Sequence, residues 1–349
     1  MEINRNDLAL AREYVAAHDF ARLTDEQLVA IVARGRVLFH WFRDHPRFHN
    51  TLNAAVILFI FTADYLALMH LPGVWLPRGQ EAPVSDVLLA SAVAGSLHSY
   101  LLYTLSSFSL HEAAAHRIAF LGQGPMAKAA QALAANLCRL AASEPDYYAR
   151  DHMVHHAKFG TEHDTEFLNF VTPRRYYLSF LPLAAFINFT DFIAHRPPTY
   201  TKSRIVSAVF STAYSGLYLF LTWQAWGPLF ALVTMLVFLP HVGFYLDRLR
   251  QFTEHNLMPL ENKDGSRSFG MGFWGLLVGG GPWGSPCHLE HHLVPSLPWY
   301  QQLNLHRFVK KTLTPIQRKQ FLLVPVVGFP LMFLRLVRNL HDFRSRARS

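Results

Sequence analysis

Residues 87–110 have the sequence VLLASAVAGSLHSYLLYTLSSFSL, which contains no Asp, Glu, Lys or Arg. About 20 apolar residues are enough to cross the hydrocarbon core of a bilayer as a helix. Gly, Ser and Thr within the run are typical of membrane helices that pack closely together. The run therefore predicts a transmembrane helix. Three more runs meet the same criterion: residues 51–71, with one charge at Asp64, residues 205–223 and residues 226–245.

The composition agrees with several spans, since 51% of the residues are hydrophobic and only 16% are charged. Soluble domains contain roughly 25% charged residues. We expect an all-α, multi-pass membrane protein with four transmembrane helices in two hairpins and a cytoplasmic helical cap. We expect amphipathic helices over residues 1–50, a membrane domain over 51–310 and a basic segment over 311–349. Residues 176–194 and 321–337 are apolar but contain Pro and polar residues, which favours helices lying in the membrane interface.

Local signals mark the N-terminal part of the chain. Thr24 and Gln27 have the spacing of a capping box at the start of an amphipathic helix over residues 24–44. Acidic residues interrupt the first segment, so we expect no secretory signal.

Cys138 and Cys287 are far apart in the sequence and predict no disulfide framework, iron–sulfur motif or redox pair.

The basic residues predict which side of the membrane each loop faces. The linker over residues 72–86 contains one, Arg78, and the turn Gln224–Ala225 contains none. Most others lie in the N-terminal segment and in residues 111–204 and 246–349. Because cytoplasmic loops are enriched in Lys and Arg, we expect these segments to be cytoplasmic.

The formal net charge of +8 has two interpretations. One is the membrane topology together with attraction to anionic lipid headgroups. The other is that the basic face attracts an acidic substrate or an acidic electron donor. Nucleic acid is not an expected partner, because the basic residues form no known reader motif.

Histidines gather on the predicted cytoplasmic side. Positions three and four apart share a helix face, so residues 152–156 and 288–292 each present three imidazoles on one face. His111 and His116 are five apart and would share a face only through a local π-bulge; otherwise each could address a different metal. The nine are His111, His116, His152, His155, His156, His255, His288, His291 and His292.

So many imidazoles predict a metal site. A single histidine is ordinarily a hydrogen-bonded polar residue, but nine packed without metal would leave ring nitrogens unpaired or mutually repelling. HEAAAH is not the HExxH zinc motif, because position 115 is Ala. A zinc site needs three or four ligands, so nine suit two metals, for which imidazole accommodates iron, zinc or copper. Neighbouring carboxylates that could orient the rings, or be ordinary solvated charges, are Glu112, Asp151, Asp164, Glu254 and Glu290.

The pattern resembles the membrane fatty acid desaturase and hydroxylase superfamily, whose motifs are H-x4-H, H-x2-HH and H-x2-HH with a further histidine after the second hairpin. HEAAAH, HMVHH, HLEHH and His255 supply these motifs, and the resemblance covers residues 50–310. It implies a non-haem di-iron centre, two Fe2+ ions held by the nine histidines, with O2 as co-substrate attacking an unactivated C–H bond of a lipid chain. Gln251 stands where some acyl-CoA desaturases have Asn, and whether it holds a metal-bound water is open.

The resemblance also implies partners. The sequence contains no HPGG motif of a fused cytochrome b5 domain. Electrons would then come from a separate donor of the ferredoxin, rubredoxin or cytochrome b5 type with its reductase. Membrane lipids surround the spans, and a lipid acyl chain is the implied substrate.

Several functions are compatible with these motifs. Desaturation of a fatty acyl chain is our leading hypothesis. Hydroxylation, oxidative decarboxylation of a fatty acid to a terminal alkene, and carotenoid oxygenation use the same chemistry. A membrane metal transporter would place its ligands along a path through the bilayer, whereas these cluster on one side. A membrane zinc hydrolase would need a three-ligand site with a base, which is not evident.

Two further features concern the substrate region. Asp64 and His98 are predicted to lie on the order of 15–20 Å deep in their helices. Since ionisable groups within a membrane usually pair, we expect them to contact each other, with a role in closing a substrate tunnel or sensing the chain end as a second interpretation. Residues 269–286 are rich in glycine and predict a re-entrant or interfacial segment that brings the third histidine motif to the others.

Overall fold

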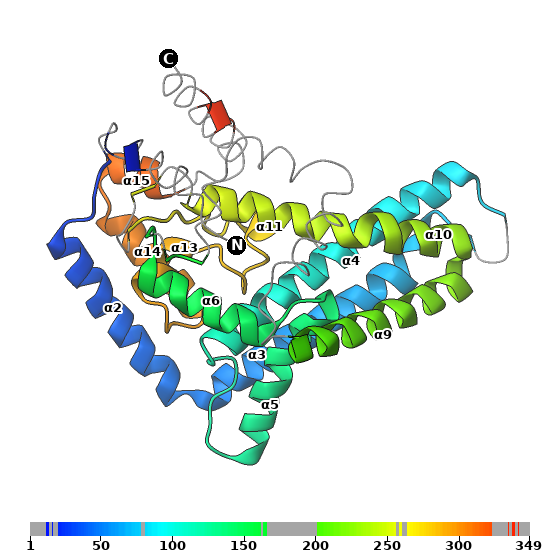
Figure 1. Ribbon diagram of the computed structural model, residues 1–349, viewed down its shortest axis with the longest axis horizontal. Coiled ribbons are helices and arrows are strands. Elements are labelled where there is room, and N and C mark those ends of the chain that lie inside the picture. The colour runs from blue at the N-terminus through cyan, green and yellow to red at the C-terminus, as the bar shows by residue number, and fades with distance from the viewer. Residues whose placement is uncertain are drawn as a thin grey trace. The chain divides into compact units, whose positions relative to one another are not determined.

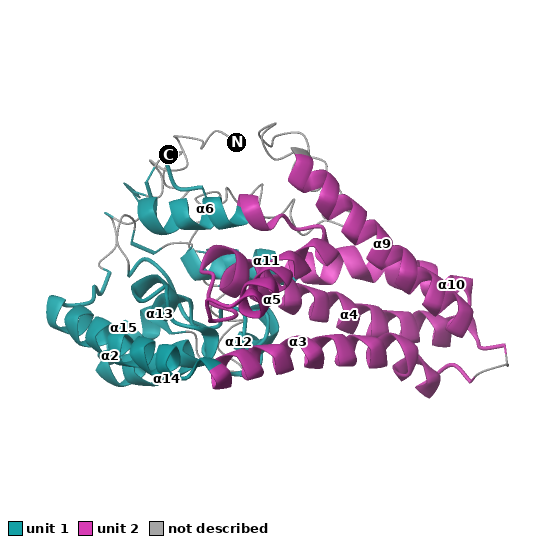
Figure 2. Cartoon of the chain, turned by 90° about the horizontal axis from the view of Figure 1, so that it is seen from below, with its two compact units in different colours: residues 1–46, 148–181, 246–349 teal, residues 47–147, 182–245 magenta. Residues whose placement is uncertain are grey.

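The computed structural model describes residues 20–77, 81–161, 163–165, 201–255, 258–259 and 264–322, together with residues 12, 13, 16, 334, 337, 338 and 341. These residues form helices and turns, with one isolated bridge between Ser268 and Leu322 (Figure 1). The chain divides into two compact units (Figure 2). Unit 1 comprises Met1–Pro46, Tyr148–Leu181 and Leu246–Ser349, and unit 2 comprises Arg47–Tyr147 and Pro182–Tyr245.

Four helical stretches among the described residues are long and apolar enough to cross a membrane. They are Pro46–Val74, Val84–Ala115, Lys202–Trp226 and Pro228–His255. The prediction of an all-α chain with four candidate spans is therefore confirmed for the part of the chain that the structure describes. The elements that compose them are α3 (Pro46–Met69), η1 (Leu71–Val74), α4 (Val84–Phe108), η2 (Ser109–Ala115), α9 (Thr201–Trp226), α10 (Pro228–Val233), η6 (Thr234–Phe238) and α11 (Leu239–His255).

The turn between the last two spans differs from its prediction at Gln224–Ala225. Both residues are helical, and α9 continues to Trp226. The chain turns at Gly227, whose φ of +89° is accessible to glycine without a steric penalty. Pro228 then starts α10 at a position where its missing N–H leaves no helix bond unmade.

Helix α4 is the centre of unit 2. It packs against α10, η6 and η3 (Leu137–Ala141). Gly95 allows the closest approach, because a Cβ there would lie 2.8 Å from Cβ of Phe238. After the π-helical turn η2, the chain continues through α5 (Pro125–Asn136) and η3 to α6 (Pro145–Lys158). The histidine motifs thus begin where α4 ends.

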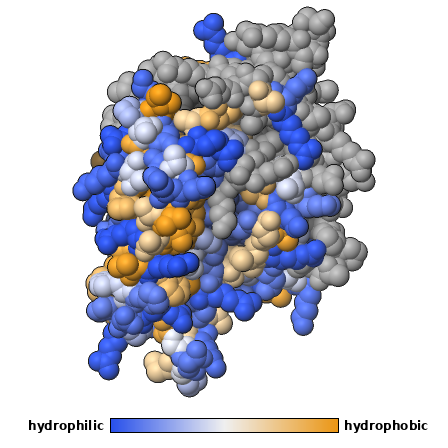
Figure 3. Space-filling view, turned by 90° about the vertical axis from the view of Figure 1, so that its left-hand side faces the viewer, coloured by the Kyte–Doolittle hydropathy of each residue, from blue (hydrophilic) through white to orange (hydrophobic). Residues whose placement is uncertain are grey.

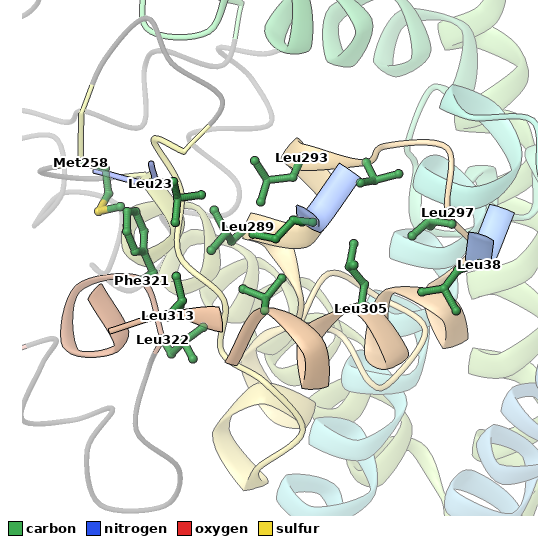
Figure 4. Close-up of a cluster of buried hydrophobic side chains, with 13 residues drawn as sticks. Leu23, Leu38, Met258, Leu289, Leu293, Leu297, Leu305, Leu313, Phe321 and Leu322 are labelled. Carbon is green, nitrogen blue, oxygen red and sulfur yellow. The ribbon is translucent and has the colours of Figure 1, made fainter. Parts of the chain in front are cut away.

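Unit 1 is built on a leucine-rich core. Helix α2 (Asp25–Asp44) packs on α14 (Trp299–Thr312), and Leu38, Leu289 and Leu305 are among the buried side chains (Figure 4). Burying each such side chain stabilises the fold by about 1.5–3 kcal/mol. This core holds α13 (His288–Leu293), which carries the third histidine motif. Helix α15 (Pro315–Phe321) follows α14 in the chain.

Helix α2 begins as its sequence predicts. The Thr24 hydroxyl accepts a hydrogen bond from the Gln27 N–H, and the Gln27 side chain accepts one from the Thr24 N–H. The helix buries one apolar face and exposes Val29 and Val37 on the other. Figure 3 views the side on which α2 lies and shows apolar patches between hydrophilic side chains.

The glycine-rich segment folds into a compact turn around α12 (Phe273–Val278) instead of a long helix. A Cβ on Gly275 would lie 1.8 Å from the carbonyl oxygen of Gly270, so only glycine permits this approach. Its short helix agrees with the prediction that the segment does not span. Residues 176–194 and most of residues 321–337 lie outside the described residues.

Candidate metal centre

Four histidines of unit 1 form the first imidazole cluster. His155 comes from α6, His255 ends α11, and His288 and His292 lie four apart on α13. Their candidate ligand atoms all lie within 4.8 Å of one another, and all four side chains are buried. Nε2 of His288 lies 2.7 Å from Nε2 of His255 and 3.1 Å from Nε2 of His292. The rings therefore point the same kind of atom at a common centre.

The other nitrogen of the His155 ring is held from outside the cluster. Its Nδ1 lies 2.8 Å from Oδ1 of Asp164, and Oδ2 of Asp164 accepts a hydrogen bond from the Gly160 N–H at 2.8 Å. Because a carboxylate accepts hydrogen bonds, Nδ1 of His155 carries the hydrogen and Nε2 keeps its lone pair. The His255 ring is held in the same way, with Nδ1 3.3 Å from the carbonyl oxygen of Gly265.

A buried carboxylate borders the same cluster. Oε2 of Glu254 lies 3.6 Å from Nε2 of His288 and 2.8 Å from Nη1 of Arg250. Its Oε1 accepts a hydrogen bond from the Ser285 hydroxyl at 3.2 Å. Glu254 is thereby balanced by a guanidinium and placed beside a ring of the cluster.

Burial and neighbouring imidazoles favour the neutral form of two rings of the cluster, those of His288 and His292. Burial lowers the pKa of His288 and of His292 well below the ordinary histidine value, and the neighbouring imidazoles lower it further. A neutral imidazole is the form that binds metal. The two rings are thus ready to act as ligands at neutral pH.

Three more histidines of unit 1 form a second imidazole group. Nε2 of His156 lies 2.7 Å from Nε2 of His291 and 3.1 Å from Nε2 of His152. The remaining pair, His152 and His291, is 3.2 Å apart. The Tyr148 ring stacks on His152, with its hydroxyl 3.4 Å from Nδ1 of that ring. The predicted three-imidazole faces are present, but each H-x2-HH motif divides its rings between the two groups.

The last two predicted histidines lie in unit 2 on a π-helical turn. The His116 N–H donates to the carbonyl oxygen of His111, five residues earlier, at 3.1 Å. The two ring centres are consequently 4.9 Å apart, as the spacing allows only with a π-bulge. Oε1 of the buried Glu112 lies 3.2 Å from Nδ1 of His111. Burial, assisted by His111, lowers the pKa of His116 to about 3.

The remaining predicted polar neighbours have other contacts. The Gln251 side chain bonds to Asp247 and Arg248 on its own helix, at 2.9 and 3.0 Å. The carbonyl oxygen of Asp151 accepts a hydrogen bond from the Thr165 hydroxyl. Glu290 contacts residues outside both imidazole groups.

Glu290 contacts a further histidine, His306, which lies outside the three histidine motifs and was not among the predicted site residues. Glu290 is buried and lies on α13 between His288 and His291 in the sequence. Its oxygens contact the Ser268 hydroxyl and Nδ1 of His306, the latter at 2.9 Å. Burial opposes protonation of His306, but the charge and hydrogen bond of Glu290 outweigh it and raise the pKa of His306. One feature of the sequence could have indicated that His306 faces the interior. It follows Gln302 by one helical turn, and Gln302 lies on the buried face of α14.

The donor set of unit 1 fits metal ions. Ring nitrogens of the two groups face each other at 2.7–3.2 Å, and a ring whose Nδ1 carries the hydrogen, as in His155 and His255, presents the lone pair of its Nε2. A cation between them replaces that repulsion by attraction, and hydrogen bonds on the far nitrogens are the usual support of metal-binding imidazoles. Imidazole donors are compatible with iron.

Comparison with known proteins agrees with this site. A family model described as fatty acid desaturase matches residues 88–321, which is more than half of the chain. The matched stretch contains all nine predicted histidines. A search of characterised protein sequences found no match.

Proposed function

This chain belongs to the fatty acid desaturase family, and we propose that it uses two irons and O2 to oxidise an unactivated C–H bond of a fatty acyl or fatty acid chain, forming a double bond. One observation carries the proposal. Imidazoles in unit 1 turn their Nε2 atoms towards common centres, while carboxylate and carbonyl oxygens hold the opposite ring nitrogens of His155 and His255.

The proposed ligands are the nine histidines. The cluster of His155, His255, His288 and His292 would hold one iron. His152, His156 and His291 would be ligands of the other, and the family motif adds His111 and His116 to the ligand set. When bound, iron supplies the redox and O2 chemistry that side chains lack.

The surrounding residues prepare the ligands. Asp164 fixes the tautomer of His155, and Arg250 balances the charge of Glu254 beside His288. All four rings of the first cluster are buried, which limits the access of water to them. Reduction of O2 to water takes more electrons than the C–H bonds provide, so a separate donor of the ferredoxin, rubredoxin or cytochrome b5 type must supply the rest.

We also propose the membrane arrangement. The four candidate spans would form two hairpins, with the histidine-bearing segments on the cytoplasmic side. Support comes from the distribution of Lys and Arg, since residues 72–86 contain a single basic residue.

The test is product analysis in a host that expresses the chain with a competent electron donor and reductase. Total lipids and headspace are compared by gas chromatography–mass spectrometry for the parent, His291→Ala and His45→Ala; His45 is an exposed histidine outside the imidazole groups. We expect a new double bond with the parent and His45→Ala but none with His291→Ala. A hydroxyl or a terminal alkene instead would replace desaturation by the corresponding reaction. No product from iron-loaded parent protein would contradict the proposed function.

A further inference from the structure

Three polar residues meet inside the candidate membrane spans of unit 2. Asp64 lies on α3, His98 on α4 and Tyr214 on α9, each near the middle of its span. Nδ1 of His98 is 2.5 Å from Oδ1 of Asp64, and the Tyr214 hydroxyl donates to Oδ2 of Asp64 at 2.7 Å. Asp64 and His98 are 2% and 0% exposed. The expected pair of Asp64 and His98 is present, and Tyr214 makes it a cluster of three.

The cluster leaves one hydrogen-bonding atom unused. The carboxylate accepts from both neighbours, so Nδ1 of His98 carries the hydrogen and Nε2 is directed away from Asp64. Among the described residues, Nε2 of His98 has no hydrogen-bond partner, and it is fully buried. The rings of Tyr214 and Tyr218 flank His98, with centres 6.1 and 5.2 Å away. A buried polar atom without a partner is unfavourable, so this atom is suited to bind one.

Its position relates it to the proposed reaction. His98 and His111 belong to one continuous helical stretch, Val84–Ala115. They are thirteen positions apart, which places His98 about 20 Å from His111 along the helix. That distance is comparable to an extended long acyl chain. Ionisable groups are expensive within a membrane and commonly mark functional sites.

We propose that Asp64, His98 and Tyr214 form a hydroxyl-binding site at mid-membrane, in which Nε2 of His98 accepts a hydrogen bond from water or from a hydroxyl at the far end of the substrate chain. This inference rests on the proposed function and adds a specificity determinant to it. A chain whose methyl end reaches the site displaces the hydroxyl and leaves Nε2 without a partner. Such a chain is penalised, whereas an equally long chain ending in a hydroxyl is not.

The test measures binding without catalysis. Iron-loaded protein in detergent is heated with fatty acids of stepwise length, each as the plain acid and with a terminal hydroxyl, and the thermal shifts give apparent affinities. The variant His98→Asn keeps an N–H for Asp64 but removes Nε2, and His98→Phe is a second variant of similar size to the parent. Thr222→Val is the matched control, because its hydroxyl bonds only within α9, to the carbonyl oxygens of Tyr218 and Leu219.

For acids long enough that the chain end reaches His98, we expect the hydroxyl-ended acid to bind the parent about tenfold more tightly than the plain acid of the same length. The difference should disappear in both His98 variants and persist in Thr222→Val. The affinities of acids too short to reach His98 define a trend with chain length. If the longer hydroxyl-ended acids only follow this trend, water is the usual occupant of the site. If they bind more tightly than the trend, the usual occupant is a substrate hydroxyl.

Equal affinities of the two acids at every length would overturn the inference, as would a difference that His98→Asn leaves unchanged. If chains bind and are oxidised without this discrimination, only the inference fails. If no chain of either kind binds, the proposed function fails and the inference fails with it.

Discussion

Asp164 controls a ring of the imidazole cluster from outside it. Its Oδ1 lies 2.8 Å from Nδ1 of His155, so it determines which ring nitrogen keeps a lone pair. Asp164→Asn retains an oxygen acceptor, whereas Asp164→Leu has none. We predict that Asp164→Leu weakens iron binding by roughly 10- to 100-fold and that Asp164→Asn weakens it less. Competition with a chelator measures the affinity, and equal affinity of Asp164→Leu and the parent would contradict the assignment.

Glu290 and His306 give a second prediction for single side chains. Glu290 is 0% exposed, and its carboxylate depends on Nδ1 of His306 and the Ser268 hydroxyl. His306→Leu removes one donor and should reduce the free energy of unfolding by about 1–3 kcal/mol. His306→Asn retains an N–H at the position of Nδ1 and should recover most of the loss. Denaturant unfolding in detergent measures both, and an equal loss in the two variants would refute the hydrogen-bond explanation.

The sequence predicted which histidines cluster better than it predicted the other residues that contact them. Three- and four-residue spacings place imidazoles on one helix face, and all seven motif histidines of unit 1 are in the two imidazole groups. The division of each motif between two groups depends on how α6, α11 and α13 pack, which spacing within one helix does not specify. The pairing of Glu290 with His306 likewise depends on the packing of α13 against α14. Tyr148 was also missed, although it precedes His152 by one helical turn.

At the scale of elements, the π-helical turn Ser109–Ala115 adapts a five-residue spacing to one pair of rings. Deleting Ala115 would give a four-residue spacing, which shares a face in an ordinary α-helix. Inserting one alanine after Ala115 would give six, which does not. We predict that the deletion retains more bound iron than the insertion. Iron content of the purified variants checks this, and equal losses would show that the π turn has another role.

Other elements show what local sequence can and cannot specify. The capping box of Thr24 and Gln27 is local, and both of its hydrogen bonds are present. The four candidate spans followed from the length of their apolar runs alone. The turn at Gly227 was missed by two residues because hydropathy does not report where the backbone needs a positive φ. The five-residue spacing of His111 and His116 predicted a π turn only if the two rings share a face, because an ordinary α-helix would keep them apart.

At the scale of the whole molecule, the proposed topology puts the two ends of the Val84–Ala115 stretch on opposite sides of the membrane. Glu81 and Gln123 are exposed residues that flank it and form a matched pair. We predict that an impermeant thiol reagent labels Glu81→Cys in intact cells but labels Gln123→Cys only after the membrane is opened. The native thiols give little background, since both are buried and burial raises the pKa of Cys138 to about 12. Labelling of Gln123→Cys alone in intact cells would reverse the topology.

The most direct test of the whole account is the iron content of the anaerobically purified chain, measured together with its Mössbauer spectrum. The nine-histidine assignment predicts two irons per chain in nitrogen-rich sites, with iron lost in His155→Ala and in His291→Ala, one variant from each imidazole group of unit 1. A chain that purifies folded with a single metal, with zinc in place of iron, or with two irons that survive both substitutions would contradict the di-iron centre.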